Sequence, residues 1–196
     1  MNLTREEARH RSEIIKVERY HVRIDVRGAD ADGATHFTSN TRVRFSTTEP
    51  DTFLDLLDGE IESVIVNGEE VEPEYDGSRI QLHGLHTHRE NLVIVTAKLP
   101  YQHTGQGLHR FVDPADGKVY LYTHFEAADS RRMYSVFEQH YLNAHGDFDV
   151  IAPSDWRVAS NQVHEDIREE EDRLLHDFAL TTRMSPFLTA IADGPC

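Results

Sequence analysis

Thirteen histidines among 196 residues make a metal site the first chemistry to test. A helical zinc site of the His-Glu-x-x-His type places two imidazoles one turn apart, with the glutamate acting as general base. The nearest match is the segment HEDIR at residues 164–168, in which Arg168 stands where the second histidine is needed. Because charge runs of this kind usually face water, we interpret the segment as solvated.

A second histidine cluster lies in QLHGLHTHRE, which contains His83, His86 and His88. Three neutral imidazoles can bind a metal ion. Gly84 favours a turn here, however, and only Glu90 is near enough in sequence to orient a ring. The spacing matches no standard ligand set, so we favour a solvated cluster and keep a small metal-binding protein as an alternative.

Nucleophilic catalysis and phosphate binding find little support. The one cysteine, Cys196, is the last residue, and no serine stands in a Gly-x-Ser-x-Gly elbow. The paired glycines of HTGQGLHR lack the Gly-Lys-Ser/Thr ending of a phosphate loop, which favours a glycine-permitted loop. A single cysteine excludes an intrachain disulfide and favours a reducing, cytoplasmic compartment.

The charge balance limits the partners. Thirty-five acidic residues against 20 basic ones give a formal net charge of −15. Nucleic acid and anionic membranes attract positive surfaces, so we expect neither as a partner. The sequence also has no apolar run long enough for a signal peptide or a membrane span.

The elements that must position these residues are mostly strands. Thr4 and Glu7 form a capping-box pattern, which predicts a short solvated helix that ends near Ile14 or Ile15. Apolar residues then alternate with polar ones over 20–26 and again over 37–45, which predicts two strands that pair antiparallel. Asn67-Gly68 predicts a type I′ hairpin.

Further strands are predicted in SRIQL, ENLVIVTAKL and KVYLYTHF, with a turn at DPADG. The polar segment 164–176 fits a helix or a charged hairpin equally well. No repeat or linker divides the chain. We therefore predict one all-β domain over 1–196, with saddle-shaped or sandwich-like antiparallel sheets and a short helix within 1–15.

Several long motifs resemble one protein family. The run YLYTHFEAADSRRMYSVFEQ at 120–139 is similar to the segment written YTQFEATDARRxFPCFDEP in the aminopeptidase N family of zinc metallopeptidases. The preceding TGQGLHRFVDPADGKV resembles actinobacterial-type members. APSDWRVASNQ and FALTTRMSPFLTAIADGP are similar to later family segments, in the same order. The resemblance thus covers nearly the whole chain.

The resemblance implies an N-terminal β domain that packs beside a catalytic domain carrying the zinc site. We expect this chain to stop where the family crosses into that domain, so it holds no catalytic residue, no metal ligand and no cofactor, and is inactive alone. The full parent would use zinc to remove N-terminal amino acids from peptides. Its partners here would be the peptide N-terminus and its own catalytic domain. A stand-alone β-sandwich binding module is the other alternative.

Two substrate-binding residues follow from the same resemblance. Glu126 matches the family glutamate that binds the free α-ammonium group of the substrate, an interaction that a carboxylate supplies as a charge-assisted hydrogen bond. His124 stands where the family usually has glutamine and would line the pocket for the first side chain. Phe125, between them, should point into the core. Arg131 and Arg132 match paired arginines that would hold the loop through carboxylate contacts.

The sequence also departs from the family pattern after this motif. Ser135 replaces a usual proline, and His140-Tyr141 replaces Pro-Asp. Loss of these prolines should leave the loop after Glu138 less restricted. Glu138 itself is expected to be structural or to face the loop, and the path of residues 134–147 stays open.

Overall fold

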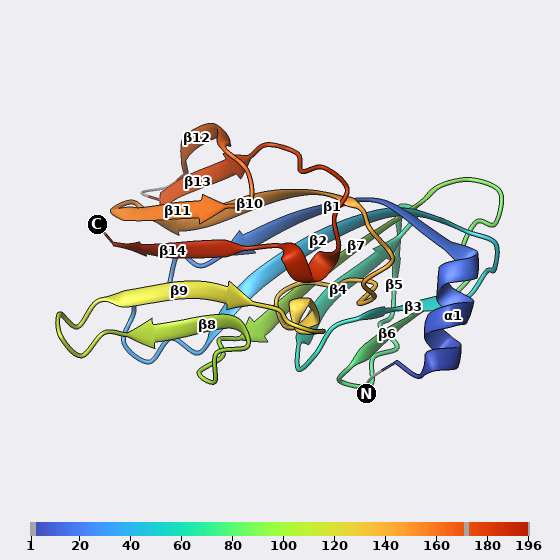
Figure 1. Cartoon of the computed structure of the whole chain (residues 1–196), viewed down its shortest axis with the longest axis horizontal. Coiled ribbons are helices and arrows are strands. Elements are labelled where there is room, and N and C mark those ends of the chain that lie inside the picture. The colour runs from blue at the N-terminus through green and yellow to red at the C-terminus, as the bar shows by residue number, and fades with distance from the viewer. Residues whose placement is uncertain (1–2, 171–172, 196) are drawn as a thin grey trace.

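The computed structural model describes residues 3–170 and 173–195, and within them three sheets contain nearly all of the regular structure (Figure 1). The large sheet has the order β12-β13-β10-β1-β2-β7-β4-β5, a second sheet has the order β11-β14-β9-β8, and β3 pairs with β6. The strands of the large sheet are β1 (Ile15–Asp25), β2 (His36–Thr47), β4 (Glu60–Val66), β5 (Glu69–Val71), β7 (Asn91–Pro100), β10 (His145–Pro153), β12 (His164–Glu170) and β13 (Arg173–Phe178). The remaining elements are α1 (Arg5–Ile14), β3 (Thr52–Asp55), β6 (Arg79–Leu82), β8 (Gly107–Val112), β9 (Val119–His124), η1 (Ser130–Arg132), β11 (Trp156–Ser160), η2 (Pro186–Leu188) and β14 (Ile191–Pro195).

Strands β1 and β2 form as their alternation predicts. Tyr20, Val22 and Ile24 are buried, while the residues between them face outward. The two strands pair antiparallel, with Tyr20 opposite Val43. Asn67 and Gly68 both have positive φ between β4 and β5, as a type I′ hairpin requires.

One pairing departs from the antiparallel expectation. Among the strand pairs of the described residues, β1 and β10 alone run parallel, with Tyr20 opposite Gly146 and Val22 opposite Phe148. Parallel neighbours cannot be joined by a tight turn and need a long connection. Here the connection is most of the chain, which local patterns do not reveal.

The core lies between the large sheet and the four-stranded sheet, which stands in front of it in Figure 1. Aromatic rings join the layers: Phe45 of β2 meets Phe137 at 4.9 Å between ring centroids. Tyr134 lies edge-on to Tyr20, Phe125 and Phe148. The predicted all-β, sandwich-like fold with a short N-terminal helix is therefore confirmed.

Helix α1 has the predicted capping box between Thr4 and Glu7 and ends at Ile14. The expectation that it is solvated throughout is wrong for Arg11, which is 2% exposed. Its Nη1 donates to Asp55 Oδ2 at 3.0 Å, and its guanidinium lies 4.4 Å from the Phe53 ring centroid. The charge is tolerated because Asp55 is buried with it, and the partly buried Phe53 ring adds a cation–π contact. No helix in the described ranges is long and apolar enough to cross a membrane.

The polar segment 164–176 forms the hairpin β12–β13, which decides between the two alternatives left open by the sequence. The strands pair antiparallel, with Ile167 opposite His176. Residues 171 and 172, which follow β12 in the sequence, lie outside the described residues, as does Cys196.

Candidate functional site

The end of β9 positions the two predicted substrate-binding residues. His124 is the last residue of β9 and pairs with Gly107 of β8. His124 and Glu126 are both exposed, whereas Phe125 between them is 2% exposed and contacts Tyr134 in the core. The prediction that Phe125 points inward is confirmed, and its burial fixes the backbone from which Glu126 projects.

Gly107 allows the loop before β8 to approach this turn closely. Its φ of +62° lies in the region that favours glycine, and an added Cβ would stand 2.8 Å from the Cβ of Arg132. The glycine-permitted loop expected from HTGQGLHR is therefore confirmed. A residue with a side chain at position 107 would push η1 away from the end of β9.

Three contacts hold the turn that follows Glu126. The backbone N–H of Asp129 donates to the carbonyl of Phe125 at 3.1 Å, and Arg132 Nε donates to Asp129 Oδ1 at 2.8 Å. On the other side, His140 Nε2 lies 2.6 Å from the carbonyl oxygen of Ala127. The peptide bond between Glu126 and Ala127 is cis. The turn is thus anchored on both sides of its exposed carboxylate.

The contact from His140 was missed by the sequence reasoning, which treated this position only as a lost proline. The His140 ring also packs on Phe187, with 4.6 Å between ring centroids. Ala127 and Phe187 lie 13 and 47 residues away from His140, so no local pattern in the sequence could have indicated either contact. The histidine supplies a side-chain restraint where the family pattern has a stiff backbone.

Glu138 is a structural residue with 6% exposure, so the loop-facing alternative is wrong. Ser130 Oγ and the backbone N–H of Arg131 both donate to Glu138 Oε2. Its own backbone N–H donates to Asp55 Oδ2 at 3.1 Å. Burial raises the pKa of Glu138, and the hydrogen bond from Ser130 offsets part of that rise. This carboxyl group joins η1 to the segment after residue 134.

The paired arginines Arg131 and Arg132 make different contacts. Arg132 makes the expected carboxylate contacts, with Asp129 and, at 3.5 Å, with Asp58. Arg131 is buried, and its carbonyl accepts a hydrogen bond from the backbone N–H of Leu57 at 2.7 Å. Both residues therefore hold η1 in place rather than face a ligand.

The carboxylate of Glu126 is left free by these contacts. Within residues 3–170 and 173–195, neither Glu126 nor His124 uses its side chain in a hydrogen bond or an ion pair. An exposed carboxylate on an anchored backbone can bind a cation or an N–H donor, and the neighbouring imidazole offers one donor and one acceptor. This arrangement suits recognition of a charged group rather than bond cleavage.

A buried carboxyl group, also missed by the sequence reasoning, lies one strand away. Asp193 of β14 is opposite Leu121 of β9 and is 5% exposed. Neither of its carboxyl oxygens has a hydrogen-bond partner among the described residues. Burial raises its pKa to about 8, and the adjacent backbone N–H of Gly194 offsets only part of that rise.

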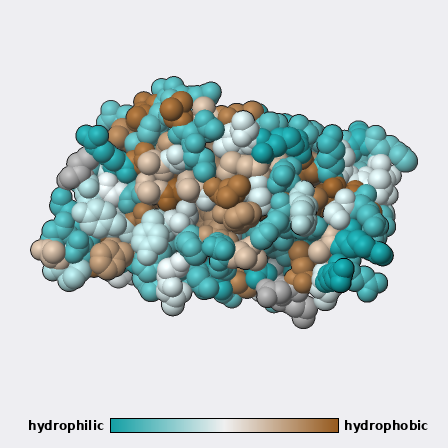
Figure 2. All heavy atoms as spheres, in the orientation of Figure 1, coloured by the Kyte–Doolittle hydropathy of each residue, from teal (hydrophilic) through white to brown (hydrophobic). Residues whose placement is uncertain are grey.

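The outer face of the four-stranded sheet carries exposed aromatic residues beside the turn. Phe111 and Tyr122 are both about two-fifths exposed, at 43% and 42%, and the His109 ring packs on Tyr122. Apolar residues also gather over the middle of this face, near η2 and β14 (Figure 2). Exposed apolar surface of this kind is typical of a protein contact.

The predicted cluster of His83, His86 and His88 does not converge on one point. His83 Nδ1 lies 3.0 Å from Asp51 Oδ1, a contact that raises the pKa of His83. His86 Nε2 accepts a hydrogen bond from Arg89 at 2.6 Å, and His88 is exposed. In the described part of the chain, no group of three His, Cys, Asp or Glu residues is placed to hold a metal ion. These residues therefore do not fit a zinc site.

The sequence profile of the Peptidase M1 N-terminal domain matches residues 18–188. The chain belongs to this family. It is 40% identical over 198 aligned residues to Aminopeptidase N of Streptomyces lividans, covering 99% of this chain and 22% of the relative. It is 27% identical to Probable aminopeptidase 1 of Saccharolobus solfataricus, covering 88% of this chain and 21% of the relative. The M1 domain described here thus spans about a fifth of the length of these curated relatives.

Solved structures support the fold. The M1 zinc metallopeptidase from Deinococcus radiodurans superposes with a TM-score of 0.77 at 16% identity. The superposition covers 93% of this chain and 42% of that chain, and an E323A mutant of the same protein gives the same TM-score. At this identity the likeness establishes the architecture of the M1 domain alone.

Proposed function

We propose that residues 1–196 form a single N-terminal domain of a zinc aminopeptidase that removes N-terminal amino acids from peptides. In this proposal Glu126 binds the α-ammonium group of the substrate, and His124 lines the pocket for its first side chain. The observation that carries it is the exposed carboxylate of Glu126, which lacks an internal partner in the described residues while the turn beneath it is anchored.

The chemistry of the two groups matches the task. An α-ammonium group has three donors and a full charge, which a carboxylate meets with a charge-assisted hydrogen bond. Because Phe125 is buried and Asp129 is bonded back to it, the backbone of Glu126 needs no ordering when the substrate binds. Such preorganisation favours both affinity and correct placement of the peptide.

Zinc in this proposal belongs to the rest of the parent enzyme. The described residues of this chain do not fit a zinc ion. The contribution of this domain is to bind and orient the amino end of the peptide. Alone, the chain is proposed to be inactive.

The outer face of the four-stranded sheet is proposed to pack against the catalytic domain. Phe111 on β8 and Tyr122 on β9, the strand that ends at His124, expose aromatic surface there. Contact at this face would bring Glu126 to the edge of the joint between the domains. The share of the Streptomyces relative covered by this chain, 22%, leaves ample length for such a domain.

The test is Glu126→Gln in the full-length parent enzyme. The substitution keeps the shape and removes the charge. A hydrogen bond to a charged group contributes about 1.5–3 kcal/mol, which corresponds to a loss of about ten- to hundredfold in kcat/KM. The loss should appear mainly in KM, because the contact already exists before the transition state. Hydrolysis of an amino-acid anilide measures both constants.

Glu70→Gln is the matched control, since Glu70 is exposed on β5 at the far end of the large sheet. It should leave kcat/KM unchanged. Glu138 cannot serve as the control, because its substitution disturbs buried hydrogen bonds. If Glu126→Gln keeps full kcat/KM while the melting temperature falls, the residue is structural and the proposal fails.

A further inference from the structure

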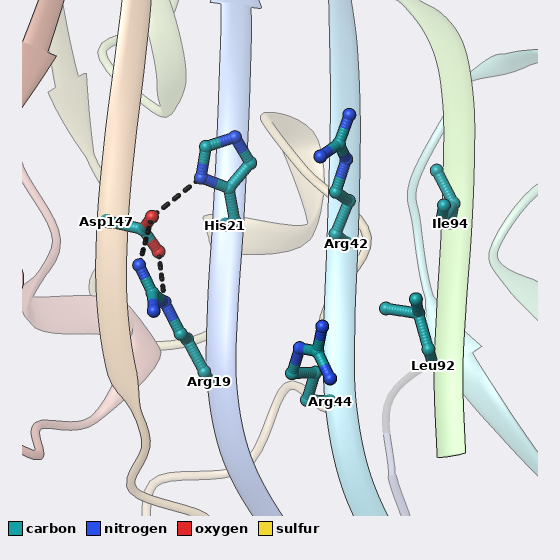
Figure 3. A pocket seen from close by; sticks show the side chains of 7 residues that line it. All are labelled: Arg19, His21, Arg42, Arg44, Leu92, Ile94 and Asp147. Atoms are coloured by element: carbon teal, nitrogen blue, oxygen red, sulfur yellow. Dashed lines mark hydrogen bonds and ion pairs between the residues drawn. The ribbon is translucent and has the colours of Figure 1, made fainter.

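The outer face of the large sheet carries a shallow cavity of about 220 Å³ on the side away from β9. Four adjacent strands line it, with Asp147 from β10, Arg19 and His21 from β1, Arg42 and Arg44 from β2, and Leu92 and Ile94 from β7 (Figure 3). The pairing registers place them in two rows. One row runs His21, Arg42, Ile94, and the other runs Arg19, Arg44, Leu92.

The single carboxylate that lines the cavity, that of Asp147, is already paired with residues of β1. Arg19 donates to both oxygens of Asp147, at 2.9 and 2.7 Å, and His21 Nδ1 lies 2.6 Å from Oδ2. Burial alone would raise the pKa of Asp147, but the hydrogen bonds from His21 and Arg19 outweigh it and lower the pKa. Asp147 therefore stays ionised and occupied, and it has little capacity left for the arginines of β2.

The two arginines of β2 have few acidic partners within the described residues. Arg44 contacts Glu90 at 2.9 Å, but both side chains are about half exposed, so the pair adds little. Arg42 forms no ion pair or side-chain hydrogen bond within residues 3–170 and 173–195. Its cross-strand neighbours are His21 and Ile94, neither of which is an acid.

The arrangement differs from an ordinary solvated face in two ways. One row further along, Arg23 is matched by Asp149 at 2.9 Å, which is how this sheet balances charge elsewhere. In the cavity, by contrast, Arg19 stands directly opposite Arg44, and their partners Asp147 and Glu90 leave Arg42 as a third arginine without a carboxylate partner among the described residues. This local excess of positive charge occurs in a chain of net charge −15.

We propose that this cavity is a binding site for a small organic carboxylate with a short apolar chain. The planar forks of Arg42 and Arg44 match the two oxygens of a carboxylate. Leu92 and Ile94 are only partly buried and provide the apolar wall beside them. The volume is below the ~300–1,000 Å³ typical of pockets for drug-sized ligands, so it suits a small anion.

The site does not depend on the proposed peptidase role. Its residues face away from the four-stranded sheet, because the residues that alternate with them on β1 and β2, such as Tyr20 and Val43, are buried in the core. Glu126 follows β9 on the other layer. Failure of one proposal therefore leaves the other untouched.

The experiment is a titration of the ¹⁵N-labelled 196-residue chain with sodium hexanoate at constant ionic strength, followed by NMR. The Nε–H signals of Arg42 and Arg44 and the amides around them should shift and saturate, with a Kd of about 1–10 mM. Acetate, which lacks the apolar chain, should bind about five- to tenfold more weakly. Arg42→Ala should weaken hexanoate binding about tenfold.

Arg168→Ala is the control, since Arg168 is an exposed arginine on strand β12 of the same sheet. It should leave the Kd unchanged. Leu92→Ser should bring hexanoate close to the affinity of acetate while keeping the arginine shifts. Shifts that do not saturate, or that are identical in Arg42→Ala, would overturn the site. Equal affinities for acetate and hexanoate would overturn the assigned ligand class.

Discussion

The buried carboxyl of Asp193 leads to a prediction about stability as a function of pH. Burial raises its pKa from 3.8 to about 8. Between these two values the folded chain holds a proton that the unfolded chain releases. Because the folded state binds more protons there, the free energy of unfolding must fall as pH rises. Asp193→Asn removes this titration while nearly preserving the shape of the side chain.

The size of the effect follows from the two pKa values. At pH 5–7 the group differs by nearly one proton between folded and unfolded chains, so it contributes a slope of about 1.4 kcal/mol per pH unit. The variant should therefore gain about 2–3 kcal/mol relative to the native chain between pH 5 and pH 7. That gain is a large share of the ~5–15 kcal/mol that holds a typical domain together.

Urea unfolding of both chains at pH 5, 6 and 7 measures this difference directly. Comparing the variant with the native chain at each pH cancels the titration of the histidines, which both chains share. Asp155→Asn is the control, because Asp155 is exposed in the turn between β10 and β11, and it should follow the native curve. If native and Asp193→Asn curves run parallel from pH 5 to pH 7, the carboxyl is hydrated or paired in solution, and the reasoning is refuted.

Three further predictions concern the turn and the chain as a whole. Gly107→Ala should cost about 1–3 kcal/mol of stability in thermal unfolding, because of its positive φ and the approach of Arg132. Glu138→Ala should cost about 1–3 kcal/mol in urea unfolding by leaving buried donors without an acceptor, and an unchanged midpoint would contradict its structural role. The isolated chain should hold no stoichiometric zinc by elemental analysis and release no amino acid from an anilide, and one tightly held zinc per chain would contradict this.

Much of the fold is readable from the sequence because its signals are local. The alternation around Tyr20 and Val22 and the turn at Asn67-Gly68 depend on neighbouring residues only. Family motifs add the position of Glu126. Pairing between residues far apart in the sequence cannot be predicted in this way. The parallel pairing of β1 with β10 joins residues 126 positions apart, such as Tyr20 and Gly146. The local pattern of neither segment indicates that partner.

The candidate site shows the same division. That Phe125 turns inward follows from period-two alternation, and the structure confirms it. That His140 contacts Ala127, and that Glu138 is buried beside Asp55, depend on how a loop without regular structure crosses the sheet. The burial of Arg11 within a charged helix was invisible for the same reason, since its partners are Asp55 and Phe53.

The parallel pairing of β1 with β10 also sets the order in which the large sheet can assemble during synthesis. During synthesis β1 can pair with β2 at once, but β10 emerges about 120 residues later, on the order of 10 s at typical rates of translation. For that interval one edge of β1 is open to other chains. Arg19 and Arg23 carry unpaired charge along it, which discourages unwanted strand addition. Once β10 has been synthesised, Asp147 and Asp149 form ion pairs with these same arginines. The charges that discourage pairing with other chains thus also align β10 on β1.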